Sequence, residues 1–375
     1  MKQEKTDRNE ILSARRVVVK VGSRLLAGKE GWIDTRFVSR LVGQIAGLRK
    51  EGKEVLLVTS GAIAAGCREL GLKRRPSSLP DLQAAAAVGQ TALMHIYHQA
   101  FRRRGLAVGQ VLLTRDGLHH RDRHLNARHT LLALLGRKIV PIINENDTVA
   151  VDEIQFGDND QLAALVANLV QADLLILLSD VDGLYAAAGA RGEVIASVEK
   201  ITPEVMALVR GGPGEHSRGG MGSKLEAAGI VTRAGGQAVI ASGTRPEVLA
   251  EIARGEAVGT YFPTSFGRIR SRKCWIAFSC LKKGRILVDE GARRALADGG
   301  KSLLASGITG VEGTFRAGDM VTVAGPDGAE FSRGLVNYSS REVELIRGEK
   351  TGKIRSILGS KPYDEVIHRD NLLIL

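Results

Sequence analysis

Apolar and polar positions follow two alternating patterns over roughly the first 260 residues. Short apolar runs that end in glycine or a polar residue, such as RVVVKVG (16–22) and KEVLLVTSG (53–61), are typical of buried strands. Between them lie amphipathic stretches such as 35–52 and 81–105, whose apolar spacing predicts helices. Continuous apolar strands separated by helices predict a largely parallel sheet lying between helices, an α/β fold.

The pattern changes near residue 262. The following sequence contains many glycines, several short strand-like runs and one helix-like stretch, EGARRALADG (290–299). This texture predicts a second, small β-rich domain. We therefore divide the chain into a polar N-terminal extension, an α/β domain, a linker and a β-rich domain with a C-terminal tail: 1–14, 15–262, 263–280 and 281–375.

Composition is that of a globular protein with two cores: 375 residues, 44% of them hydrophobic. No apolar run approaches the roughly 20 residues of a membrane-spanning helix. The N-terminus lacks the apolar core of a signal peptide, so we expect a cytoplasmic protein. The cysteines, three in number and without a CxxC pair, indicate neither a disulfide framework nor a zinc site.

A formal net charge of +12 changes this picture by suggesting anionic partners. Seven of the basic residues and no acidic residue lie in 267–285. Both a nucleic acid and a small anion such as a nucleotide are compatible with this excess.

Polar side chains stand where four predicted strands end. Lys20 interrupts an apolar run, and Ser60 precedes Gly61 at a helix start. The other two ends carry further polar groups: Asn144 with Asp147, and Ser179 with Asp180. Ligands gather at the carboxyl ends of parallel strands, and a buried lysine beside a glycine turn suits a phosphate. Ordinary turns, a helix cap and a lysine that extends to solvent are the alternative interpretations.

Two further stretches precede predicted helices. GDND (157–160) places Asp158, Asn159 and Asp160 before an apolar helix, where helix capping and ligand binding are both possible interpretations. SRGGMGSK (217–224) is a glycine-rich loop that ends in Ser223 and Lys224. Such loops bind phosphates through backbone N–H groups, although this spacing is not that of a Walker A motif.

The sequence gives less support to a P-loop, a metal site or a hydrolase. The run ALADGGKS (295–302) has Ala295 where a P-loop requires glycine. HHRDRH (119–124) does not have the spacing of a metal site, so we expect surface or loop histidines and assign no metal ligands. No G-x-S-x-G elbow supports a hydrolase. Two lysines, a glycine-rich loop and polar strand ends favour a kinase without a P-loop, in which positioning and charge neutralisation promote phosphoryl transfer.

These stretches together resemble the glutamate 5-kinases of the amino acid kinase family. The resemblance is carried, in order, by VVVKVGSRLL, VTSGAIAAG, PIINENDTV, FGDNDQLAALVA, LLSDVDGLY and GGMGSK. The region from GRILVDEGARRAL onward resembles the PUA domain that many members carry at their C-terminus. The resemblance implies the amino acid kinase fold followed by a PUA domain.

It also implies ATP-dependent phosphorylation of the side-chain carboxylate of L-glutamate to L-glutamyl 5-phosphate, the first step of proline biosynthesis. By similarity, Lys20 and Lys224 neutralise the transferring phosphoryl group and Asp160 holds both lysines. Glutamate would bind to Ser60, Asn144, Asp147 and Asn159. ATP would contact Lys20, Ser179, Asp180 and the loop residues Arg218, Gly219, Gly220, Met221, Gly222, Ser223 and Lys224. The cofactors implied are ATP and Mg²⁺, with proline as feedback inhibitor and a homo-oligomeric state.

The chain departs from the family pattern in its glycine-rich loop and after DGLY, where AAAGARG replaces a common Asp-Pro pair, and related activities remain alternatives. The loop commonly reads G-T-G-G-M-x-T-K, whereas Arg218 here stands where threonine is usual. Relatives of the same fold phosphorylate aspartate, acetylglutamate, carbamate or uridylate, but the KVGSRLL opening and GDNDQL favour glutamate. RNA binding through the PUA domain is a further hypothesis, as an accessory property.

Overall fold

The computed structural model describes residues 8–28, 33–150, 159–186, 192–209, 220–265, 282–360 and 363–375. The chain divides into two compact units, residues 1–268 and 269–375, which we describe separately. Most of the predicted linker 263–280 lies outside the described residues, so that boundary stays a prediction.

The first unit is built on a seven-stranded sheet in the order β3-β4-β2-β1-β5-β6-β7. All neighbouring strands in it are parallel except β6 and β7. The strands are β1 (Arg16–Val21), β2 (Glu54–Val58), β3 (Val108–Leu113), β4 (Val140–Glu145), β5 (Leu174–Ser179), β6 (Gln237–Ser242) and β7 (Thr260–Phe262). The largely parallel α/β sheet expected from the apolar runs is confirmed.

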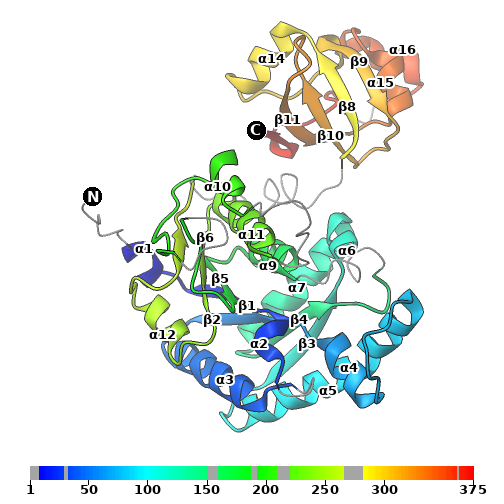
Figure 1. Ribbon diagram of the computed structural model, residues 1–375. Coiled ribbons are helices and arrows are strands. Elements are labelled where there is room, and N and C mark those ends of the chain that lie inside the picture. The colour runs from blue at the N-terminus through cyan, green and yellow to red at the C-terminus, as the bar shows by residue number, and fades with distance from the viewer. Residues whose placement is uncertain are drawn as a thin grey trace. The chain divides into compact units, whose positions relative to one another are not determined.

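Helices cover both faces of this sheet (Figure 1). They are α1 (Asn9–Leu12), α2 (Ser23–Leu26), α3 (Thr35–Lys50), α4 (Ala62–Glu69), α5 (Leu79–Arg102), α6 (Arg115–His119), α7 (Arg121–Gly136), α9 (Asp160–Val170), α10 (Pro203–Ala207), α11 (Met221–Arg233) and α12 (Val248–Ala253). Side chains from α3, α5 and α12 form one core with the sheet, and side chains from α7, α9 and α11 form the other.

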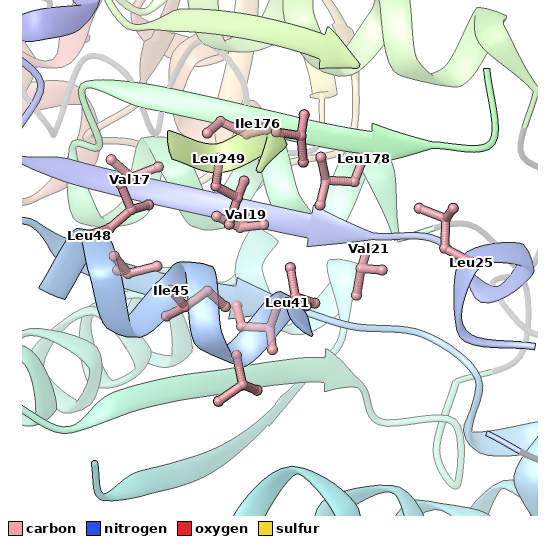
Figure 2. Packing of buried hydrophobic residues seen from close by; sticks show 14 of the residues in the cluster. Val17, Val19, Val21, Leu25, Leu41, Ile45, Leu48, Ile176, Leu178 and Leu249 are labelled. Atoms are coloured by element: carbon pink, nitrogen blue, oxygen red, sulfur yellow. The ribbon is translucent and has the colours of Figure 1, made fainter. Parts of the chain in front are cut away.

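The alternation of side chains along β1 decides which core each of its residues enters. Figure 2 shows Val17, Val19 and Val21 packed against side chains of α3. Val18 belongs to the opposite core, with α9 and α11. Lys20, two residues further on, therefore points to the face that α9 and α11 cover. The strand is central, paired with β2 and β5, so that Lys20 lies inside the domain.

Three residues of the predicted N-terminal extension are buried in this unit: Arg8, Ile11 and Ala14. The Arg8 guanidinium, 3% exposed, donates hydrogen bonds to the backbone carbonyls of Ala196, Glu256, Val258 and Gly259. Ile11 is fully buried in the core. The described end of the extension therefore packs on the α/β domain.

The second unit has a five-stranded sheet in the order β12-β11-β10-β8-β9, in which only β8 and β10 are parallel. Its elements are β8 (Lys282–Val288), α14 (Glu290–Ala297), η2 (Ala305–Gly307), β9 (Ile308–Gly313), β10 (Met320–Ala324), β11 (Glu330–Leu335), α15 (Ser340–Ile346), η3 (Thr351–Lys353), α16 (Ile354–Leu358), η4 (Arg369–Asn371) and β12 (Leu372–Ile374). It has a separate apolar core that includes Phe315 and Tyr338. The small β-rich domain with a helix near 290 is confirmed.

Candidate active site

Lys20, Asp160 and Lys224 meet at the carboxyl end of β1. Asp160 is fully buried at the first turn of α9. One of its oxygens, Oδ1, pairs with Lys20 Nζ, and the other, Oδ2, lies 3.0 Å from Lys224 Nζ. The two lysines are 2% and 6% exposed. A single carboxylate therefore holds two ammonium groups from different elements in a site largely shielded from water.

The start of α11 adds to this cluster. Ser223 Oγ lies 2.9 Å from Asp160 Oδ2 and 2.8 Å from the carbonyl oxygen of Gly220. Gly220, Met221 and Gly222 form the beginning of the helix, whose first N–H groups have no partner within the helix. Lysines beside a helix N-terminus form an arrangement suited to phosphate oxygens. Arg218 and Gly219 of the predicted ATP loop lie outside the described residues.

A pocket of about 130 Å³ lies at the ends of β2 and β4. All four predicted glutamate-binding residues line it: Ser60, Asn144, Asp147 and Asn159. Gly61 lines it as well, in a left-handed conformation (φ 99°) that favours glycine and turns the chain from β2 into α4. The sheet thus brings together polar residues that are far apart in the sequence.

Asn159 is the N-cap residue of α9, but its side chain does not cap the helix. Instead, its Nδ2 donates to the carbonyl oxygen of Thr59 and to Asn144 Oδ1, the latter at 2.7 Å. The capping interpretation of GDND is therefore wrong for Asn159. The carboxylate of Asp160 forms ion pairs with the two lysines. Asp158 lies outside the described residues.

Ser179 and Asp180 lie at the carboxyl end of β5, next to β1. Ser179 Oγ donates to Asp180 Oδ1 at 3.1 Å, and Arg24 Nη1 lies 3.1 Å from Asp180 Oδ2. Burial opposes ionisation of Asp180, but hydrogen bonds led by that from Arg24 outweigh it and lower the pKa of this carboxyl. Asp180 is therefore charged at neutral pH. Its predicted contact with ATP stays a prediction.

Three polar residues of the pocket were not found from the sequence: Ser23, Arg75 and Glu145. Glu145 lies inside the NEND run, between two residues that were singled out, so its position was a signal. Arg75 comes from the connection between α4 and α5 in a polar stretch, KRRPSS, where nothing distinguishes it from Arg74. Only the folded chain shows that Arg75 lines the pocket.

One histidine of the run 119–124 is buried, contrary to the expectation of surface or loop histidines. His124, expected at the surface or in a loop, is 7% exposed within α7. Burial lowers its pKa to about 4, and Arg128 acts in the same direction. Within the part of the chain that the structure describes, no group of three or more histidine, cysteine or acidic residues is placed to hold a metal ion.

Among the described residues, no helix is both long and apolar enough to cross a membrane.

Comparisons with known proteins agree with this geometry. The model of the amino acid kinase family matches residues 15–242, and that of the PUA domain matches residues 284–358. The glutamate 5-kinase of Moorella thermoacetica is 47% identical over 375 residues, which are 99% of each chain. That of Geobacter sp. strain M21 is 49% identical over 372 residues, which are 98% of this chain and 100% of the relative.

Among solved structures, a UMP kinase from Bacillus anthracis is similar, with a TM-score of 0.47 at 15% identity, over 68% of this chain and 97% of that chain. The family models and the full-length relatives are decisive. The chain belongs to the amino acid kinase family, as an ATP-using kinase similar over its whole length to glutamate 5-kinases, and it carries a PUA domain after its kinase domain.

Proposed function

We propose that the chain transfers the γ-phosphoryl group of ATP to the side-chain carboxylate of L-glutamate. One observation carries the proposal. Asn159 lines the small polar pocket, and the next residue, Asp160, holds the two buried lysines. An acceptor in the pocket would thus lie next to the cationic groups that neutralise a transferring phosphoryl group. The glutamate 5-kinase relatives support this choice of acceptor.

The proposed step is a direct in-line displacement. A carboxylate oxygen of glutamate forms a bond to the γ-phosphorus, the bond from that phosphorus to the β,γ-bridging oxygen breaks, and ADP leaves with the electron pair. The acceptor is already ionised at neutral pH, since a glutamate side chain has a pKa of about 4.3, so no general base is required. Lys20 and Lys224 would stabilise the charge on the phosphoryl oxygens, which is the main contribution of such sites.

The charges around the pocket suit both ends of an α-amino acid. Arg75 is basic and would pair with the α-carboxylate, while Glu145 and Asp147 are acidic and would attract the α-ammonium group. Acetylglutamate and carbamate lack an ammonium group. At about 130 Å³ the pocket is small compared with the roughly 300–1,000 Å³ of pockets for drug-sized ligands, which favours a small acceptor over a nucleotide such as uridylate. These features favour a small α-amino acid over acetylglutamate, carbamate and uridylate, and the choice of glutamate over aspartate rests on the glutamate 5-kinase relatives.

Mg²⁺ belongs to this proposal as the counterion of ATP. It keeps several waters in such sites and binds through substrate phosphates with only one or two carboxylates. The described residues contain no ligand cluster that fits a protein-held ion, so we assign no residue to Mg²⁺ and derive no step through it.

A coupled ADP-release assay with glutamate, aspartate, acetylglutamate and carbamate side by side tests the substrate. Hydroxylamine added to the glutamate reaction should yield the hydroxamate, because it traps an acyl phosphate but not a phosphate ester. Folded protein that releases no ADP with glutamate would refute the proposal. ADP release without hydroxamate would place the phosphate on another group.

The remaining expectations follow from this activity. We propose that it is the first, cytoplasmic step toward proline and that proline inhibits it; an unchanged rate at millimolar proline would remove the inhibition. We also propose a homo-oligomer, which light scattering would test. RNA contact is proposed for the PUA domain, which is the type of domain matched at 284–358. Filter binding over a salt series checks this contact, because a phosphate-driven affinity must fall steeply with salt.

A further inference from the structure

A chain of side-chain hydrogen bonds connects helix α5 with the start of α9. Gln90 Oε1, on α5, accepts a hydrogen bond of 2.7 Å from Asn144 Nδ2. Asn144 Oδ1 accepts one of 2.7 Å from Asn159 Nδ2, which also donates to the carbonyl oxygen of Thr59. Asn144 and Asn159 are 2% and 8% exposed. The three amides therefore form a relay at the wall of the pocket.

The orientation of each amide in this relay is determined by the carbonyl oxygen of Thr59, at its end. A side-chain amide can usually be turned over, exchanging its nitrogen and oxygen, and only its partners decide the orientation. The carbonyl oxygen of Thr59 can only accept, so it requires the nitrogen of Asn159. The second N–H of that nitrogen then requires the oxygen of Asn144, and the nitrogen of Asn144 requires the oxygen of Gln90.

The consequence concerns what Asn159 can offer to a ligand. Both N–H groups of its amide are used within the protein, so its remaining hydrogen-bonding capacity is that of Oδ1, which accepts. The one group of ionised glutamate that donates hydrogen bonds is the α-ammonium. Asn159 therefore acts on glutamate as an acceptor for the α-ammonium group, a choice that its residue type alone leaves open.

Helix α5 supports the relay at both ends. Gln90 follows Gly89, where α5 lies so close to α4 that an added Cβ would stand 1.9 Å from the carbonyl oxygen of Ala62. Seven residues on, buried Tyr97 is 2.9 Å from Thr59 Oγ1, and burial raises the pKa of this phenol so that it stays protonated. Thr59 in turn donates to the carbonyl oxygen of Ser60.

We propose that Gln90 is a positioning residue for glutamate, which acts through Asn144 to aim Asn159 Oδ1 at the α-ammonium group. The proposal rests on the proposed function. Gln90 Nε2 is buried and has no hydrogen-bond partner among the residues that the structure describes, so the side chain acts through its oxygen. A substitution of Gln90 that keeps an acceptor should preserve the relay. A substitution that removes the acceptor should break the hydrogen bond to Asn144.

The test compares Gln90→Met, Gln90→Glu and the control Gln83→Met by the KM for glutamate and the inhibition constant of glutarate. Glutarate has both carboxylates of glutamate but no ammonium group. Gln83 lies two turns earlier on α5, and its amide donates to the carbonyl oxygen of Ala150, outside the relay. Gln90→Ala replaces the methionine variant if thermal melting shows that the latter does not fold.

Gln90→Met should raise the KM for glutamate about tenfold, the scale of a lost hydrogen bond to a charged group, with kcat and the KM for ATP within about twofold. The inhibition constant of glutarate should not change, Gln90→Glu should recover most of the affinity, and Gln83→Met should match the parent.

A parallel loss of glutarate binding would mean general damage to the pocket and overturn the proposal, as would an unchanged KM for glutamate in a parent enzyme that uses it. A parent enzyme that does not turn over glutamate would instead refute the proposed function, and this inference with it.

Discussion

Replacing Lys224 by methionine separates a catalytic from a structural role of the buried cluster. The methionine keeps the length of the aliphatic stem and removes the ammonium group, with its charge and its hydrogen bond to Asp160 Oδ2. Asp160 retains its ion pair with Lys20 and its hydrogen bond from Ser223, so the substitution does not isolate the carboxylate. We expect turnover to fall steeply while the unfolding free energy changes little.

The magnitude follows from the geometry. At 3.0 Å and an effective dielectric constant of about 20, the attraction between Lys224 and Asp160 is about 5.5 kcal/mol. Burying the ammonium group costs several kcal/mol, which offsets most of that attraction. The net loss of unfolding free energy should therefore be at most about 2 kcal/mol. Losing one preorganised charge at the transferring phosphoryl group should lower kcat about 10²–10³-fold.

Asp160→Asn provides the contrast. It leaves two ammonium groups, 2% and 6% exposed, without the carboxylate they share. Breaking a buried pair in this way costs about 3–5 kcal/mol, so this variant should lose turnover and stability together. ATP should restore part of its stability, because phosphate oxygens would supply the missing negative charge.

The assay pairs urea unfolding, followed by circular dichroism, with hydroxamate formation per folded molecule. Lys53→Met is the control, because Lys53 Nζ donates to the carbonyl oxygen of Ala14 and is outside the cluster. The reasoning is refuted if Lys224→Met destabilises as much as Asp160→Asn while each folded molecule keeps normal turnover. Lys224 would then be a structural partner of Asp160 only.

Three further predictions test other parts of the kinase domain. Arg75→Ala should raise the KM for glutamate about tenfold. It should not change the KM for 4-aminobutyrate, which lacks the α-carboxylate. An equal rise in both KM values would exclude pairing of Arg75 with the α-carboxylate. His124, with a pKa of about 4 when folded and about 6.5 when unfolded, takes up its proton more readily in the unfolded chain, so stability falls as pH drops. Between pH 6.5 and 4.5, the His124→Gln variant should therefore lose about 2 kcal/mol less unfolding free energy than the parent protein. The same pH dependence for both proteins in urea titrations would contradict this. Gly89→Ala should lower the free energy of unfolding by about 3 kcal/mol, because the added Cβ would meet the carbonyl oxygen of Ala62. The control Gly47→Ala, whose Cβ would have no atom within 4 Å, should leave stability unchanged or raise it. Similar melting curves for both variants would disprove the close crossing of α4 and α5.

Much of the fold was predictable because it depends on local pattern. Continuous apolar runs can be buried on both faces only in a covered parallel sheet, and this sheet is what the structure contains. The same pattern predicted that Lys20, Ser60, Asn144 and Ser179 stand at strand ends, since each follows or interrupts an apolar run. Their assembly at one edge then follows from the parallel direction of the strands.

The partners of each polar group were decided by the tertiary structure. Two interpretations of GDND, helix cap and ligand site, were both open for Asn159, because asparagine suits both. The choice depends on Asn144 and Thr59, which β4 and β2 bring beside the start of α9. Arg75 illustrates the same limit, since its neighbour Arg74 is identical in type.

By itself, the sequence determined which segments are strands or helices and which chemical groups stand at their ends, because backbone preference and side-chain alternation act over a few residues. Only the tertiary structure decided that one carboxylate serves two lysines, that the amide of Asn159 is committed as a donor, and which arginine reaches the pocket. These are pairings between residues distant in the chain, and they depend on how the helices cross and pack on the sheet.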